Sequence, residues 1–159
     1  MVGYTEMTNL FKKKVDEFKR FLDLSLQIKD FQIDIFAQWV DKRQVIIDEI
    51  EQINHKIETT KKKLSSDQQQ LIDGIFTLSV ELAFVPKEWE TIYLFLLEIK
   101  TIKVKISENE KRIMNLLENY KRNILMQMEE VNTKSQKIGY ISSFNGSANT
   151  CGNLYDSKK

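Results

Sequence analysis

Apolar residues recur at intervals of three and four along most of the chain, which is the spacing of one face of an α-helix. Two such stripes occur in the N-terminal part, Phe11, Val15, Phe18 and Leu22, and then Phe21, Leu24, Ile28, Phe31 and Ile35. A region that is apolar on more than one side is expected to be well buried. The pattern predicts helices at about 8–30, with Thr8 as the N-cap, and at about 32–64. It leaves open whether residues 8–64 form one rod or two helices jointed near 30–34.

Two local signals divide the next part of the chain. Ser66, followed three residues later by Gln69, resembles a capping box and predicts a helix at about 66–84. Pro86 lacks an amide hydrogen and disfavours a helical residue before it. We therefore expect Pro86 to end that helix and to begin the next one.

The last predicted helix, at about 87–138, is the longest. Gly139 predicts its end, and the serine, asparagine and glycine residues of 139–159 predict a flexible tail. The predicted fold class is therefore all-α. It consists of one helical domain, residues 1–138, formed as an elongated antiparallel bundle or hairpin of long amphipathic helices, with a flexible C-terminal tail.

A single apolar seam runs along the last predicted helix. It comprises Ile99, Ile102, Ile106, Asn109, Ile113, Leu116, Tyr120, Ile124, Met128 and Val131. Its intervals resemble those of a coiled coil. If the chain bends near residue 32, a second helix of about 50 Å would leave the seam from Tyr120 to Ile138 exposed. If residues 8–64 are one rod of about 85 Å, that rod could cover the whole last helix, and the seam would be core.

An apolar helix face of a few hundred Å² that stays exposed is typical of an interaction site. Methionine in such a face adapts to irregular partner surfaces. Asn109 interrupts the seam, and it either fixes register against a neighbouring helix or meets a partner protein. The predicted partner-binding residues are Asn109, Ile113, Leu116, Leu117, Tyr120, Ile124, Leu125, Met128 and Val131.

Composition argues against catalysis and against nucleic-acid binding. The formal net charge is +1, and nearby acidic residues balance the lysine triplets at 12–14 and 61–63. His55 is the only histidine and Cys151 the only cysteine, so neither an ordinary zinc site nor a nucleophilic triad is expected. No Gly-rich phosphate loop occurs, and we expect no enzyme, no cofactor and no metal.

The longest apolar run, 92–97, is too short for a membrane span, and a cytoplasmic protein is expected.

Residues 30–53 read DFQIDIFAQWVDKRQVIIDEIEQI, in which an Arg-Gln pair precedes an isoleucine repeat. Residues 107–131 read SENEKRIMNLLENYKRNILMQMEEV, and the chain ends in an aromatic-Asp-basic group, Tyr155, Asp156 and Lys158. In these features the chain resembles the FlgN/FliT-type flagellar export chaperones. It departs from that family at Gln32, where an acidic residue is common.

The resemblance implies a chaperone of flagellum assembly. Members of the family bind the C-terminal helical segments of hook-associated or cap proteins through the last helix, and deliver them to components of the type III export gate. We expect the apolar seam to accept such an amphipathic helix. Two other interpretations are a coiled-coil scaffold that acts through self-association as a homodimer, and, less in keeping with the net charge, a nucleic-acid-associated helical protein.

Overall fold

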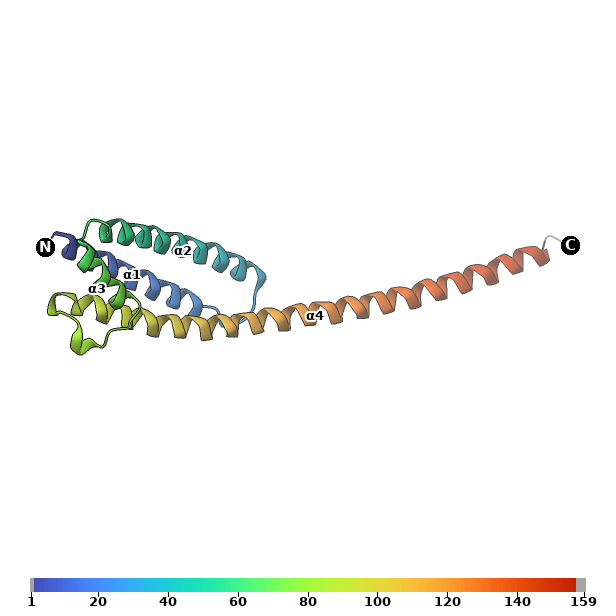
Figure 1. Ribbon diagram of the computed structural model, residues 1–159. Coiled ribbons are helices and arrows are strands. Elements are labelled where there is room, and N and C mark those ends of the chain that lie inside the picture. Colours follow the sequence, from blue (N-terminus) through green and yellow to red (C-terminus); the bar gives the residue numbers. More distant parts are fainter. Residues whose placement is uncertain (1, 157–159) are drawn as a thin grey trace. The chain divides into compact units, whose positions relative to one another are not determined.

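The computed structural model describes the backbone of residues 2–156 and the side chains of residues 3–141. Over this part of the chain every regular element is helical and no strand occurs (Figure 1). The elements are α1 (Val2–Leu26), α2 (Ile33–Lys61), α3 (Ser66–Phe76), the 3₁₀ turns η1 (Leu82–Phe84) and η2 (Lys87–Trp89), and α4 (Glu90–Asp156). The predicted all-α fold class is confirmed. The chain divides into two units, Met1–Leu116 and Leu117–Lys159.

α1 and α2 are two separate, antiparallel helices of the first unit, joined at residues 27–32 (Figure 1). The joint is held by Arg112 of α4, whose Nη1 donates to the carbonyl oxygen of Ile28 at 2.6 Å and whose Nη2 donates to that of Ser25 at 3.2 Å. The carbonyl oxygen of Ser25 is one of those that a helix end leaves without partners, and that of Ile28 lies in the joint just after the helix. The interpretation of 8–64 as one rod is therefore wrong, and the jointed interpretation is confirmed.

The boundaries of these two helices differ from the predicted ones. α1 begins at Val2, because Thr8 is not an N-cap; its Oγ1 donates to the carbonyl oxygen of Tyr4 inside the helix. The hydroxyl bonds back to the preceding turn, which is a common position for threonine within a helix. α2 ends at Lys61 rather than near 64.

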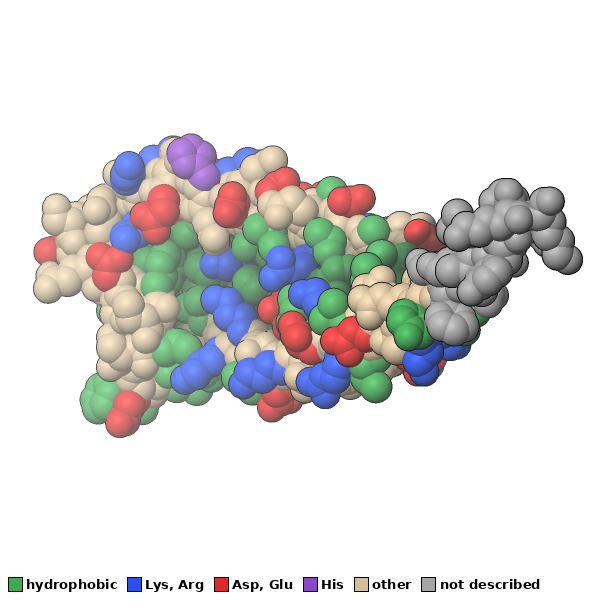
Figure 2. Space-filling model, turned by 90° about the vertical axis from the view of Figure 1, so that its right-hand side faces the viewer, with side chains coloured by type: hydrophobic (Ala, Val, Ile, Leu, Met, Phe, Trp, Pro, Cys, Tyr) green, Lys and Arg blue, Asp and Glu red, His purple; other side chains and the backbone are tan. Residues whose placement is uncertain are grey.

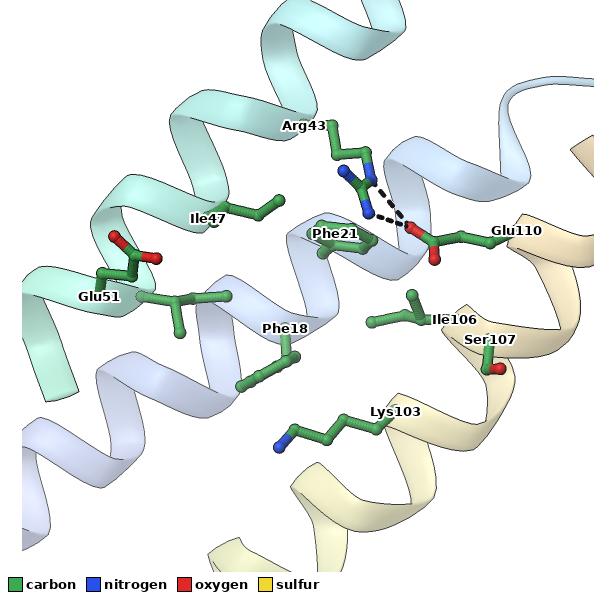
Figure 3. Close-up of a pocket in the computed structure, with 10 residues that line it drawn as sticks. Phe18, Phe21, Arg43, Ile47, Glu51, Lys103, Ile106, Ser107 and Glu110 are labelled. Atoms are coloured by element: carbon green, nitrogen blue, oxygen red, sulfur yellow. Dashed lines mark hydrogen bonds and ion pairs between the residues drawn. The ribbon is translucent and has the colours of Figure 1, made fainter. Parts of the chain in front are cut away.

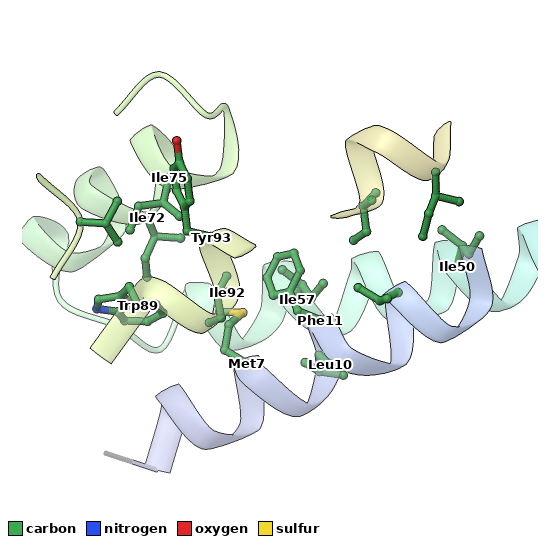
Figure 4. Close-up of a cluster of buried hydrophobic side chains, with 14 of the residues drawn as sticks. Met7, Leu10, Phe11, Ile50, Ile57, Ile72, Ile75, Trp89, Ile92 and Tyr93 are labelled. Carbon is green, nitrogen blue, oxygen red and sulfur yellow. The ribbon is translucent and has the colours of Figure 1, made fainter. Parts of the chain in front are cut away.

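The core of the first unit lies where α1, α2, α3 and the start of α4 meet (Figure 4). Its completely buried apolar side chains are Met7, Ile72, Ile75 and Ile92, with Phe11 nearly so. The Phe11 ring meets Phe76 edge-on at a centroid distance of 5.1 Å, and Tyr4 meets Trp89 at 5.3 Å. Burying each large apolar side chain contributes about 1.5–3 kcal/mol, so this cluster fixes the bundle.

α3 begins at Ser66, as predicted, but its N-cap lies one residue before the predicted cap and the helix ends eight residues earlier than predicted. Ser65, not Ser66, is the N-cap, and it forms the capping box with Gln68. The helix ends in a Schellman motif, in which the amide of Ser79 donates to the carbonyl of Gly74. Leu78 has a φ of 54° in this motif, where glycine would be unstrained.

Pro86 separates η1 from η2 and precedes α4, as predicted, but it does not end the preceding helix, because α3 has already ended at Phe76. The part of α4 inside the first unit, residues 90–116, is similar in length to α1, with 25 residues, and α2, with 29. Three helical segments of matched length therefore pack together in this unit.

α4 does not end at Gly139 as predicted but extends to Asp156. A terminating glycine adopts the left-handed conformation, and no described glycine of this chain has a positive φ. Glycine inside a helix costs only about 1 kcal/mol relative to alanine, so it does not have to stop one. For the predicted tail the structure describes the backbone up to Asp156 and the side chains up to Ile141; the side chains of 142–156 and all of residues 157–159 lie outside the described residues.

Candidate functional site

The second unit begins at Leu117 and, over its described residues, consists of one helical segment of α4. Every side chain from Lys121 to Ile141 is exposed. The exposed fraction is 36% for Ile124, 56% for Met128 and 61% for Val131. A large apolar side chain on a globular protein normally loses most of its surface to the core, so this segment carries apolar surface that its own helix cannot bury.

Some of the apolar side chains of this segment, which are exposed or half-buried, form a narrow stripe. With about 100° between successive residues of a helix, five of the predicted residues fall within an arc of about 80°. These residues, which we name the apolar stripe, are Leu117, Tyr120, Ile124, Met128 and Val131. By the same spacing Leu125 lies about 60° outside the stripe, and Met126 lies on the opposite side of the helix. A stripe of this width is typical of a surface that pairs with one other helix.

Two of the predicted partner-binding residues belong to the bundle core instead. Ile113 is completely buried in a cluster with Ile28 and Trp39, and Leu116 packs against the same cluster. Ile113 offers no surface to a partner, so its assignment was wrong. The seam is continuous in sequence, but α1 and α2 cover its first part and bury it.

Asn109 is half-buried, and its Nδ2 donates to the carbonyl oxygen of Lys105 on its own helix at 2.9 Å. This bond contradicts the interpretation that Asn109 fixes register against a neighbouring helix. The other interpretation, that Asn109 meets a partner protein, stays a prediction.

A groove between α1, α2 and α4 was not anticipated from the sequence (Figure 3). It has a volume of about 300 Å³ and an apolar lining of Phe18, Phe21, Ile47, Ile50 and Ile106. Across it, Nε and Nη2 of Arg43 each lie 2.8 Å from Oε1 of Glu110. The guanidinium of Arg43 also stacks on Phe21, 5.3 Å from the ring centroid. Arg43 and Glu110 are 67 residues apart, and nothing in the sequence indicates that they pair.

Arg43 belongs to the Arg-Gln pair on which the family resemblance partly rests. Its ion pair with Glu110 joins α2 to α4, and its guanidinium lies 5.8 Å from the ring centroid of Trp39. Gln44, the second member of the pair, donates to Asp48 one turn along the same helix. Arg43 therefore holds α2 against α4, whereas the bond made by Gln44 stays within α2.

Among residues 3–141 no three His, Cys, Asp or Glu side chains converge on a position that could hold a metal ion. No helix in the described part of the chain is both long and apolar enough to cross a membrane. Cys151 and the terminal group Tyr155, Asp156 and Lys158 have side chains outside the described residues.

Comparison with known proteins adds no relative: no family model, no curated protein and no solved structure matches this chain.

Proposed function

We propose that this chain is a binding protein of the export-chaperone type, which holds an amphipathic helix of a client protein against the apolar stripe of α4. The observation that carries the proposal is the exposure of Ile124, Met128 and Val131 on one face of an uninterrupted helix. Apolar surface arranged in this way is stabilised when a second helix covers it, because burial contributes about 25 cal/mol per Å².

The physical state of the segment favours a partner. Isolated helices gain little from propensity alone, and most helical stability in proteins comes from packing of an amphipathic face. Residues 121–141 are exposed on all sides. A client helix lying along the stripe would supply the packing that this segment does not make by itself. Met128 adds a flexible side chain that fits clients of differing shape.

The family resemblance narrows the class of client. The sequences at 30–53 and 107–131 resemble those of FlgN/FliT-type chaperones, and the apolar stripe lies largely in the second of them. We therefore propose that the client is the C-terminal helical segment of a flagellar hook-associated or cap protein. The chaperone would bind it in the cytoplasm, prevent its premature assembly and deliver it to components of the type III export gate.

A second candidate function is a scaffold in which the apolar stripe pairs with a second copy of the chain. The spacing of three and four residues in the stripe favours this alternative, since it is also the spacing of helices that pair in coiled coils. The two candidates differ in what covers the stripe. Light scattering distinguishes them: a chain that stays monomeric until peptide is added supports the chaperone, and a stable dimer that ignores peptide supports the scaffold.

The direct test is titration calorimetry of the full chain with C-terminal peptides of hook-associated and cap proteins. Binding should be seen with at least one peptide and be lost in the double variant Ile124→Asp, Met128→Asp. Helix content should be retained in that variant, because substitutions at exposed positions usually change stability by less than about 0.5 kcal/mol. Absence of heat with every peptide would contradict the proposed client class, and unfolding of the double variant would show that the stripe is core.

A further inference from the structure

A second groove in the first unit is lined by lysine and apolar side chains and by no acidic residue. Its volume is about 470 Å³, and we name it the basic groove. Its lining consists of Lys14 from α1, Phe76 from the end of α3, Leu78, and Leu96, Ile99, Lys100, Lys103, Val104 and Ser107 from α4. Figure 2 shows lysine and arginine side chains lying on hydrophobic surface on one face of the molecule. The basic groove thus combines an apolar floor with an excess of positive charge.

The three lysines of the basic groove lack acidic partners. None of Lys14, Lys100 and Lys103 forms an ion pair with any described carboxylate. Lys14 and Lys103 instead lie over phenylalanine rings, with Nζ 5.7 Å and 5.3 Å from the respective centroids. Burial, and next the charge of Lys103, lower the pKa of Lys14. Lys14 is half-buried, whereas Lys100 and Lys103 are exposed. The charge of Lys103 disfavours the charged form of Lys14, and the negative charge of Glu58 offsets part of this effect.

Neighbouring parts of the same helices show how such cations are normally neutralised. Lys19 of α1 pairs with Glu98 of α4 at 2.8 Å. In the adjoining groove of Figure 3, which shares Lys103 and Ser107 with the basic groove, Arg43 pairs with Glu110. No glutamate lines the basic groove itself, and its lysines form no ion pair of this kind.

Leu78 adds a second observation at the same place. Its φ of 54° is a left-handed conformation that costs a non-glycine residue roughly 1–2 kcal/mol. In return, its side chain lines the basic groove and packs on the core cluster. A glycine at this helix end would be unstrained, but it would leave the groove without this apolar surface. Backbone strain of this kind is found at binding sites more often than elsewhere.

We propose that the basic groove is a second docking site, which takes a partner peptide segment with a bulky apolar side chain flanked by carboxylates. The apolar side chain would lie on Leu78, Leu96 and Ile99, and the carboxylates would pair with Lys14 and Lys103. The apolar, concave lining fits a peptide side chain better than a flat anionic bilayer. Three lysines are also few for a phosphate backbone, which specific proteins neutralise with more contacts. The inference rests on the first unit alone and does not depend on the apolar stripe.

The probe is a fluorescein-labelled amphipathic peptide of about 18 residues, long enough to form helix, with leucine on one face and glutamate on both flanks. Fluorescence anisotropy with the full chain should give saturable binding that weakens as salt rises. The double variant Lys14→Gln, Lys103→Gln should weaken binding at least about tenfold. Lys111→Gln, an exposed lysine of the same helix that does not line the groove, is the matched control and should bind as the unaltered chain does.

A second arm keeps the test independent of protein folding. The same peptide with glutamine in place of glutamate should bind the unaltered chain at least about tenfold more weakly. The proposal would be overturned if the two peptides bound the unaltered chain equally, or if the double lysine variant bound the glutamate peptide as well as the unaltered chain does. It would also be overturned if the chain bound phosphatidylglycerol vesicles through these lysines but did not bind the peptide. The variant Ile124→Asp, Met128→Asp should bind the probe normally. Loss of probe binding in that variant would place the probe on the apolar stripe and would also overturn the proposal.

Discussion

Replacing Arg112 with methionine tests whether one side chain fixes the joint between α1 and α2. The aliphatic stem is kept, but the guanidinium is lost, and with it the bonds to the carbonyl oxygens of Ile28, at 2.6 Å, and Ser25, at 3.2 Å. A hydrogen bond from a charged donor contributes about 1.5–3 kcal/mol, and we take the lower part of that range because the side chain is only half-buried. Because the bond to Ser25 is long and therefore weak, the free energy of unfolding should fall by about 2 kcal/mol in total.

Urea unfolding followed by circular dichroism and by tryptophan fluorescence measures this loss. Trp39 packs with Ile28 in the cluster beside the joint, so its emission should shift toward that of exposed indole earlier in the titration. Arg112→Lys should recover part of the loss, because one ammonium keeps the charge but cannot span two carbonyl oxygens as the guanidinium fork does. Arg122→Met, at an exposed arginine of the same helix, is the matched control. If Arg112→Met and Arg122→Met unfold at the same urea concentration, the account of the joint is wrong.

Three further predictions concern stability. Ser65→Ala removes the side-chain cap of α3 and should cost about 1 kcal/mol in urea unfolding. Gly74→Ala should leave the free energy of unfolding nearly unchanged, because a gain in helix propensity of about 1 kcal/mol is offset by a new Cβ that lies 3.0 Å from Cγ2 of Val80. In a Val80→Ala background this close contact is removed, and Gly74→Ala should stabilise the protein by about 1 kcal/mol. Lys14→Met should raise the unfolding temperature by a few degrees at neutral pH, because burial and the charge of Lys103 lower the pKa of Lys14. At pH values between that lowered pKa and the ordinary value of 10.5, the unfolded chain binds more protons than the folded one. The free energy of unfolding of the unaltered protein therefore rises with pH in this range, and the stability advantage of Lys14→Met should shrink.

Much of the fold could be predicted from the spacing of apolar residues along the chain and from one proline. The intervals of three and four predict helices throughout, and Pro86 locates the start of the last one to within a few residues. The end of α3 could not be predicted, because the helix stops at a leucine in the left-handed conformation rather than at a glycine. The sequence left open whether there is a joint before α2. The residue that holds it, Arg112, lies 84 residues away from Ile28 in the chain.

The candidate site was predictable only in part, for a related reason. Ile113 and Ile124 occupy equivalent positions of one regular seam, so spacing alone assigns them the same role. The structure separates them, because Ile113 packs against Ile28 and Trp39 while Ile124 is exposed. Which side chains remain accessible depends on how far α1 and α2 extend along α4, and helix length is the feature that sequence predicts least well. The two grooves depend on pairings between distant residues, which spacing does not encode.

Met128 and Met126 provide the most direct test of the apolar stripe, because they match in residue type, helix and exposure and differ only in direction. Met128 lies in the stripe and is 56% exposed, whereas Met126 lies on the opposite side of the helix and is 59% exposed. In titration calorimetry with a client C-terminal peptide, Met128→Asp should weaken binding at least about tenfold, or 1.4 kcal/mol, while Met126→Asp should leave the affinity within about twofold. Equal affinities for the two variants would contradict the claim that this face of α4 receives the client helix.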